Sequence, residues 1–449
     1  MQVAENKPLF NRRSLVSLIG PLLVEQALAV TIGMADTVMV SGLGEAAVSS
    51  ISLVDSISVL LIQVFSALAA GGAVVVSQYV GSRDQKNACA AANQLFQIAF
   101  LCAMVIAIPS LLFNRAILGA VFGELEPAVM SGAMTYYALC AVSYPFLAVY
   151  NSGAAVFRSM GNSRVSMYAS IVMNIVNVAG NALLIFVVKI GVAGAGISTL
   201  ISRALGAVIL TALLCKKNQP VHLDKVWQFR FTKGIVSRIL RMGVPNGLEN
   251  GMFQIGKLLV MRLIAGMGTA AIAANAIGNT LSGIAVLPGS GIGLGMVTVV
   301  GQCMGARRPD EAAHNTKLLM IASHALMLIT CSIEFFFAHQ IIGLFELSEE
   351  AYVMAVNVTM FYDVCSFLFW PESFTLPCAL RGAGDARFTM IVSMLSMWIF
   401  RIGFSFLLVK VFNLGLMGVW EAMVIDWLAR IVCFIIRFAR GKWRSIQLI

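Results

Sequence analysis

The residues of this chain that could do chemistry are charged and amide side chains inside apolar stretches. Asp36 is one of them, placed among apolar neighbours in the segment GMADTVMV at residues 33–40. A charge at the centre of a membrane-crossing helix costs about 2.5–3.5 kcal/mol on insertion scales. Asp36 therefore needs a partner or a water-filled cavity.

Three asparagines follow in one later apolar stretch. Asn177 and Asn181 are four residues apart, and Asn174 precedes Asn177 by three, so a helix would present them on one face. Amide carbonyl oxygens coordinate hard cations, which would make this face part of an ion site. Hydrogen bonding between helices, a common role of asparagine in membranes, is the alternative.

Two glutamates occupy matching places, because Glu25 and Glu249 each lie four residues after a proline. Either acid could line a central cleft. The alternative is a partly buried glutamate near a helix end, hydrogen-bonded to a kinked turn.

A second polar face follows Glu249. Asn250, Gln254 and Lys257 are spaced four and then three residues apart and share one side of a helix. A lysine in mid-membrane needs a counter-ion, and Glu249 and Asp363 are the candidates. We expect a structural ion pair here, although these residues are also candidates for the walls of a substrate cleft.

The elements that must position these residues are membrane helices. Of the 449 residues, 59% are hydrophobic and 12% are charged, against about 45–50% and 25% in soluble proteins. We count about twelve apolar stretches, from 15–39 to 416–438, each near or above the ~20 residues that cross a bilayer as a helix. Alternation typical of a membrane barrel is absent. The sequence predicts an all-α polytopic membrane protein.

The chain repeats itself about 224 residues on. The recurring residues include two prolines, two glutamates, two glutamines and a Gly-x-Gly followed by Ala-Ala: Pro21 and Pro245, Glu25 and Glu249, Gln78 and Gln302, residues 42–47 and 266–271. Inverted or parallel repeats in a membrane protein form two halves that move about a site between them, as in transporters. We expect two pseudo-symmetric six-helix lobes, 1–215 and 238–449, around a central cleft, with a basic linker at 216–237.

Lysines and arginines concentrate at the N-terminus, in every second connection and at the C-terminus. Basic connections stay in the cytoplasm, so we expect both ends of the chain there. The net charge of +10 then reflects membrane topology and attraction to anionic lipid headgroups, and needs no nucleic-acid partner.

Four segments, in their order and pairing, resemble the multidrug and toxic compound extrusion (MATE) family. They are GMADTVMV with GLGEAA at 33–47, QYVGSR at 78–83, FRSMGN at 157–162 and LRGAGD at 380–385. The resemblance covers essentially the whole chain. It implies a V-shaped pair of six-helix lobes.

The resemblance also implies that Asp36 binds a coupling proton or Na⁺ together with polar residues of the fifth span, here Asn174, Asn177 and Asn181. Many relatives have an aspartate where Asn181 stands, so one ionisable group is lost from this site. Some branches have a second cation site on spans seven and ten. Glu249 and Asp363 do not match those positions, and Lys257 argues against Na⁺ nearby.

The function that we expect is secondary active efflux of organic, often cationic and amphipathic compounds in exchange for Na⁺ or H⁺, by alternating access. A flippase for lipid-linked precursors is the alternative. The four histidines have no metal-ligand spacing, and no phosphate-binding loop or nucleophile motif occurs, which argues against an enzyme or an ATP-driven pump. We expect a cofactor-free monomer in a bacterial inner membrane, in contact with lipid and a small organic substrate.

Overall fold

The computed structural model describes residues 8–224 and 228–449; within helix α1 (Arg12–Ser41) the side chains of residues 32 and 34–37 are also outside the described part. The described residues form helices and turns, without a β-strand. Ten of their helical segments are long and apolar enough to cross a membrane. Helices α8 (Lys233–Ala265) and α16 (Gly415–Ala439) are also long but carry more charge. With these two the described part has twelve, which confirms the predicted all-α polytopic fold.

The helices pack into two compact units. One comprises Leu28–Gly247 with the last residue, and the other comprises Met1–Ala27 with Leu248–Leu448. Helices α1 and α8 contribute to both units, and each divides shortly after its internal proline, Pro21 or Pro245. The expected boundaries at 1–215, 216–237 and 238–449 follow the sequence repeat and, like the central cleft, stay predictions.

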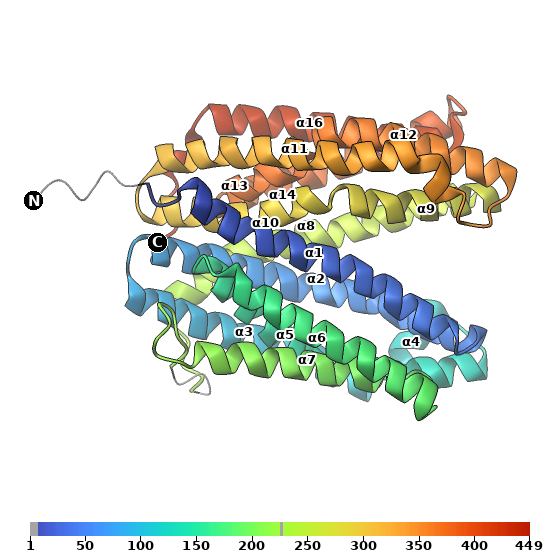
Figure 1. Cartoon of the computed structure of the whole chain (residues 1–449), viewed down its shortest axis with the longest axis horizontal. Coiled ribbons are helices and arrows are strands. Elements are labelled where there is room, and N and C mark those ends of the chain that lie inside the picture. Colours follow the sequence, from blue (N-terminus) through green and yellow to red (C-terminus); the bar gives the residue numbers. More distant parts are fainter. Residues whose placement is uncertain (1–7, 225–227) are drawn as a thin grey trace, which may run out of the picture. The chain divides into compact units, whose positions relative to one another are not determined.

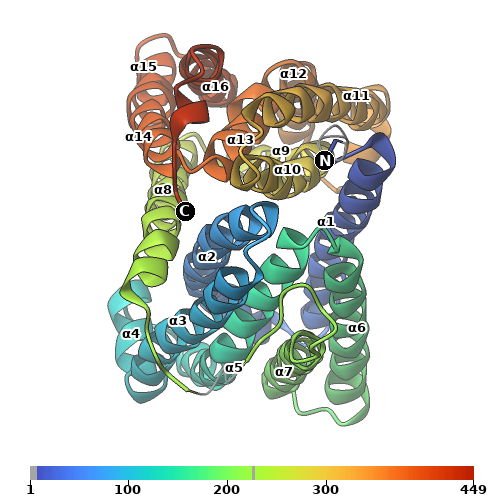
Figure 2. The same cartoon turned by 90° about the vertical axis from the view of Figure 1, so that its left-hand side faces the viewer.

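In the unit of residues 28–247, helix α5 is central, because it packs on α2, α3 and α7, while α6 packs on α7 (Figures 1 and 2). Besides parts of α1 and α8, this unit contains α2 (Glu45–Gly81), α3 (Gln85–Leu112), α4 (Asn114–Phe122), α5 (Pro127–Ser159), α6 (Ser163–Asn181), the π-helix η1 (Ala182–Val187) and α7 (Val192–Leu214).

In the other unit, α12 packs on α9, α11 and α16, and the last two run alongside it in Figure 1. This unit contains α9 (Thr269–Ala285), α10 (Leu287–Gly305), α11 (Pro309–Ile342), α12 (Glu349–Trp370), η2 (Pro371–Thr375), α13 (Leu376–Gly382), α14 (Ala386–Ser396), η3 (Met397–Gly403), α15 (Phe404–Lys410), α16 and η4 (Lys442–Ser445).

The repeat is visible in the backbone of the connecting turns. Arg83 and Arg307, which are equivalent in the repeat, have φ angles of 60° and 58°. Left-handed backbone is uncommon for residues other than glycine. Lys189 and Asn413, another equivalent pair, have φ angles of 58° and 54°. Since even these unusual conformations recur, the two halves share their local geometry as well as their sequence.

The turn before α3 is fixed by Asp84 at the N-cap position. Its Oδ1 accepts the backbone N–H of Asn87 at 3.0 Å, and its Oδ2 accepts the Asn87 amide at 2.6 Å. These hydrogen bonds, the backbone one first, hold the pKa of Asp84 below its usual value. The equivalent residue before α11, Arg308, makes no side-chain cap. Helix α11 begins instead with Pro309, which has no N–H to satisfy.

The N-terminal part of α1 belongs to the core of the unit that also holds α10. Leu15, Leu18 and Ile19 are buried together with Ile292 and Met296. A Cβ atom on Gly295 of α10 would lie only 2.2 Å from the Ile19 side chain, so this close approach requires glycine. Leu15, Leu18 and Ile19 thus pack against residues more than half the chain away.

Candidate functional site

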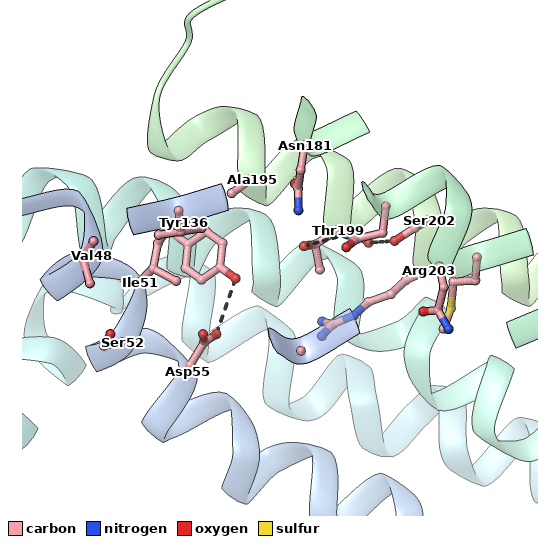
Figure 3. A pocket seen from close by; sticks show the side chains of 15 residues that line it. Val48, Ile51, Ser52, Asp55, Tyr136, Asn181, Ala195, Thr199, Ser202 and Arg203 are labelled. Atoms are coloured by element: carbon pink, nitrogen blue, oxygen red, sulfur yellow. Dashed lines mark hydrogen bonds between the residues drawn. The ribbon is translucent and has the colours of Figure 1, made fainter. Parts of the chain in front are cut away.

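A cavity of about 340 Å³ opens within the unit of residues 28–247. Its walls come from α1, α2, α5, α6 and α7 (Figure 3). Helices α6 and α7 approach closely beside it, since a Cβ atom on Gly180 would lie 2.5 Å from the hydroxyl oxygen of Ser198. That hydroxyl donates to the backbone carbonyl of Asn177 at 2.6 Å, which fixes the two helices against each other.

All three asparagines expected from the sequence line this cavity. The side chains of Asn177 and Asn181 are buried, with 7% and 2% exposed. The Asn177 amide donates to the Thr199 hydroxyl of α7 at 3.4 Å, and the Asn174 amide donates to Ser170 at 3.2 Å. The site therefore combines carboxamide and hydroxyl groups, and their oxygens are the donors that hard cations prefer.

The side chain of Asp36 lies outside the described part of the structure. Two other residues of α1, Gly33 and Val40, line the cavity. Asp36 is three residues after the first and four before the second, so its position in the helix is on the face that they share.

Three residues that were not among the expected site residues also line the cavity. Figure 3 shows the Tyr136 hydroxyl directed at Asp55, to whose Oδ1 it donates at 3.4 Å. Arg203 lines the cavity from α7, donates to Ser143 at 2.7 Å and is near enough to interact electrostatically with Asp55. The available signal was a charged residue in each of two apolar stretches, but the sequence does not say that both face one cavity.

The second polar face of the sequence belongs to the other unit. Glu25 of α1 is half-buried there, as are Asn250 and Gln254 of α8. Glu249 accepts a hydrogen bond from Arg381 of α13 at 2.7 Å, with the two side chains 12% and 20% exposed. Glu249 therefore pairs with an arginine of its own unit.

Lys257 does not form the expected ion pair with Glu249 or Asp363. Its ammonium group lies 5.2 Å from the ring centre of Phe253, one turn earlier on α8, where it interacts with the face of the ring. Lys257 is eight residues after Glu249 on the same helix, about 12 Å along its axis, and Arg381 of α13 is the partner of Glu249 instead.

Asp363 lies beside an acid, Glu334, that was not among the expected site residues. It lies on α12, is 1% exposed and faces the carboxyl group of Glu334 on α11, which is 5% exposed. Glu334 lies within an apolar stretch, and that position was its only sequence signal.

Within the described residues, no three histidine, cysteine or acidic side chains gather as transition-metal ligands would. The oxygen-rich wall beside Asn177 and Thr199 fits Na⁺ or a proton better than a soft metal, because carbonyl and hydroxyl oxygens are hard ligands.

Comparison with known proteins identifies the family. The family model MatE matches residues 21–183 and 245–407, one match in each half of the repeat. The transporter YisQ of Bacillus subtilis is 28% identical over 450 residues, which cover 98% of this chain and 96% of that protein. A multidrug resistance protein NorM of Thermotoga maritima is 27% identical over 449 residues, covering 97% and 93%.

The fold is also that of solved relatives. A crystal structure of MATE in the bent conformation aligns over 96% of this chain and 95% of its own, with a TM-score of 0.87 at 20% identity. With two family matches at the spacing of the repeat and membrane-crossing helices in both halves, the chain is a membrane transporter of the MATE family.

Proposed function

We propose that this chain is a secondary active efflux transporter, which exports organic, often cationic and amphipathic compounds in exchange for Na⁺ or H⁺ by alternating access. Membership of the family and the drug-resistance name of the NorM relative support the export of such compounds. The observation that carries the proposal is the cavity in which Asn177 and Asn181 meet the face of α1 that includes Asp36.

In this proposal Asp36 is the group whose charge changes when the coupling ion binds. An ionised carboxyl within a membrane is costly, so a proton or Na⁺ stabilises the conformation that holds it. Asn177, Asn181 and the Thr199 hydroxyl supply neutral oxygens around that ion. Asp55, held by Tyr136, gives the cavity a second acid and partly offsets the aspartate that is replaced by Asn181.

Export follows if the coupling ion and the substrate favour opposite conformations. The coupling is reciprocal, because an ion that weakens substrate binding must itself be weakened by substrate to the same degree. An organic cation would compete directly for a carboxylate in the cavity. Arg203 repels such a cation at one end of the cavity and so directs it toward the acids.

We further propose that the protein works as a monomer in a bacterial inner membrane with both ends in the cytoplasm. The distribution of lysine and arginine supports this orientation. A single cysteine at Arg83 or Arg307 should then react only with a reagent added from the cytoplasmic side. Reaction from the outside at either position would contradict it.

Transport in liposomes tests the main proposal. The purified protein would be reconstituted, and uptake of a fluorescent organic cation would be followed under a Na⁺ gradient alone and a pH gradient alone. One of the two should drive accumulation, and an ionophore should abolish it. If the folded and inserted protein took up the cation at the same rate with and without either gradient, this would contradict ion-coupled export.

A further inference from the structure

Two buried carboxyl groups, Glu334 of α11 and Asp363 of α12, face each other in the unit of residues 248–448. Their side chains are 5% and 1% exposed. Among the described residues no N–H or O–H group donates to any of their four carboxyl oxygens. Two acids are therefore placed side by side, away from water, without the hydrogen bonds that would stabilise them as carboxylates.

Two hydroxyl groups on the same face of α12 are also buried and without hydrogen-bond partners among the described residues. Thr359 is four residues before Asp363, and Ser366 is three after it. They are 2% and 0% exposed, and neither hydroxyl oxygen has a hydrogen-bond partner within the described chain. Ser366 lies beside the Cys331 thiol, which itself neighbours both acids. Buried polar atoms are rarely left without partners, so a proton or a water molecule bound here would satisfy them.

Among the described residues, no basic side chain forms an ion pair with either acid. The titratable groups that face the pair are the thiol of Cys331 and the phenol of Tyr362, both neutral at physiological pH. Helix α9, which packs on α12, contains no ionisable residue. Further charged groups lie on neighbouring segments. Arg430 pairs with Asp426 at 2.9 Å on α16, and Glu372 of η2 pairs with His324 at 3.1 Å. Arg401 of η3 lies near the Tyr362 phenol and donates to the Met423 sulfur at 3.0 Å.

The repeat shows that this place in the fold does not require acids. The residue equivalent to Glu334 in the first half is Ser110, whose hydroxyl accepts from Tyr137 at 3.0 Å. A neutral hydrogen bond thus fills the corresponding position. Packing alone does not explain why the second half carries two carboxyl groups there.

We propose that Glu334 and Asp363 form a proton-binding site, in which one proton is shared between the two carboxyl groups. Two adjacent buried carboxylates do not both ionise readily. Protonation forms one O–H bond on one carboxylate, with the proton taken from hydronium and water left behind. The new O–H then donates to the other carboxylate, which gives both acids the hydrogen bond that they lack.

A pocket of about 150 Å³ within the same unit is lined by Asp363, Cys331 and Phe367, among others. In this proposal the proton reaches and leaves Asp363 through that pocket. Use of this site in transport rests on the ion-coupled export proposed above, whereas proton binding itself does not.

Infrared spectroscopy of the full-length protein in lipid nanodiscs, without substrate or Na⁺, tests the binding. At neutral pH the protein should show the C=O stretching band of a protonated carboxyl group, shifted in D₂O. The double variant Glu334→Gln/Asp363→Asn should lose the part of that band that comes from the pair, seen as the difference between the wild-type and variant spectra. The matched variant Glu346→Gln/Glu349→Gln, which removes two exposed acids, should retain it.

Several outcomes overturn the proposal. The band could be missing from the wild-type protein at neutral pH, or it could be unchanged in the double variant. A change of carboxylate bands with added Na⁺, in place of the protonated band, would identify a metal-ion site instead. Thermal unfolding of each variant checks that it is folded; should the double variant unfold, Glu334→Gln alone must still weaken the band and change its pH dependence.

The transport assay separates this proposal from the preceding one. If no gradient drives transport but the band is present and lost as described, only the export proposal fails. If transport is coupled to a gradient and the double variant transports with an unchanged pH dependence and an unchanged band, only the proton site fails.

Discussion

The two halves of this protein share a backbone but not their chemistry. The cavity of the unit that contains α2 to α7 is lined by amides and hydroxyls, with Asp55 and the Asp36 face of α1. In the other unit the carboxyl groups of Glu334 and Asp363 are buried, and Asp363 lines a pocket of about 150 Å³. Positions equivalent to Asp36 and Asp55 are Val260 and Asn279, while Glu334 corresponds to Ser110. Each half thus has acids where the other is neutral, and the two ion sites that we propose differ accordingly.

We expect the largest change in gradient-driven export from Asp36→Asn, in the half with the amide-lined cavity. The amide keeps the size of the side chain but cannot change charge when an ion binds, so gradient-driven export should fall to the level of empty liposomes. Transport per inserted molecule is the measurement, with Asp84→Asn in an exposed turn as a control that stays active. Normal export by Asp36→Asn would move the coupling step to the other half.

Arg430→Met probes the fixed charges of the second half. Arg430 and Asp426 are 2% and 0% exposed, and their atoms are 2.9 Å apart. Removing one partner of a buried ion pair costs about 3–5 kcal/mol in the free energy of unfolding. The double variant Arg430→Met/Asp426→Leu should regain most of that stability, as measured by thermal or denaturant unfolding. Equal stability of wild type and Arg430→Met would show that this pair is not structural.

Asn177→Ala should have an intermediate effect on the cavity. Loss of one oxygen donor to a charged ligand, worth about 1.5–3 kcal/mol, weakens the apparent affinity for the coupling ion roughly 10–100-fold. The maximal rate should change less, because the carboxylate remains. Transport rates across a series of ion concentrations give both values, and Asn279→Ala on α9 is the matched control. A lowered maximal rate with unchanged affinity would assign Asn177 to packing.

The smallest expected effect is on stability, from substitutions in the turns before α3 and α11. Asp84→Ala removes the cap of α3 and should destabilise the protein by about 1 kcal/mol. The hydrogen bonds from Asn87 lower the pKa of Asp84, so their contribution is present above the pKa of the unfolded chain and disappears as pH falls through the lower, folded value. Arg308→Ala, at the uncapped start of α11, keeps Asp84 and should lose this contribution on acidification as the wild-type protein does, whereas Asp84→Ala should not. The comparison is by unfolding at neutral and acidic pH.

The sequence predicted the parts of this molecule that depend on pattern within one segment. Hydropathy and the repeat were enough for the helical fold, and helical spacing placed the three asparagines on one face. Partners across helices could not be predicted, since spacing within a helix says nothing about which neighbour packs on it. Glu249 was therefore assigned to Lys257 instead of Arg381, and Glu334, a single acid before three phenylalanines, was overlooked.

The division of α1 between the two units affects the order in which the chain folds during synthesis. Its first part, with Leu15, Leu18 and Ile19, is buried against α10, which is synthesised only in the second half of translation. During synthesis, proteins generally fold domain by domain from the N-terminus. Here Leu15, Leu18 and Ile19 stay without their native neighbours until α10 has been synthesised. A nascent chain stopped before residue 287 should therefore leave this N-terminal segment open to proteases and chaperones, even when the unit of residues 28–247 has already folded.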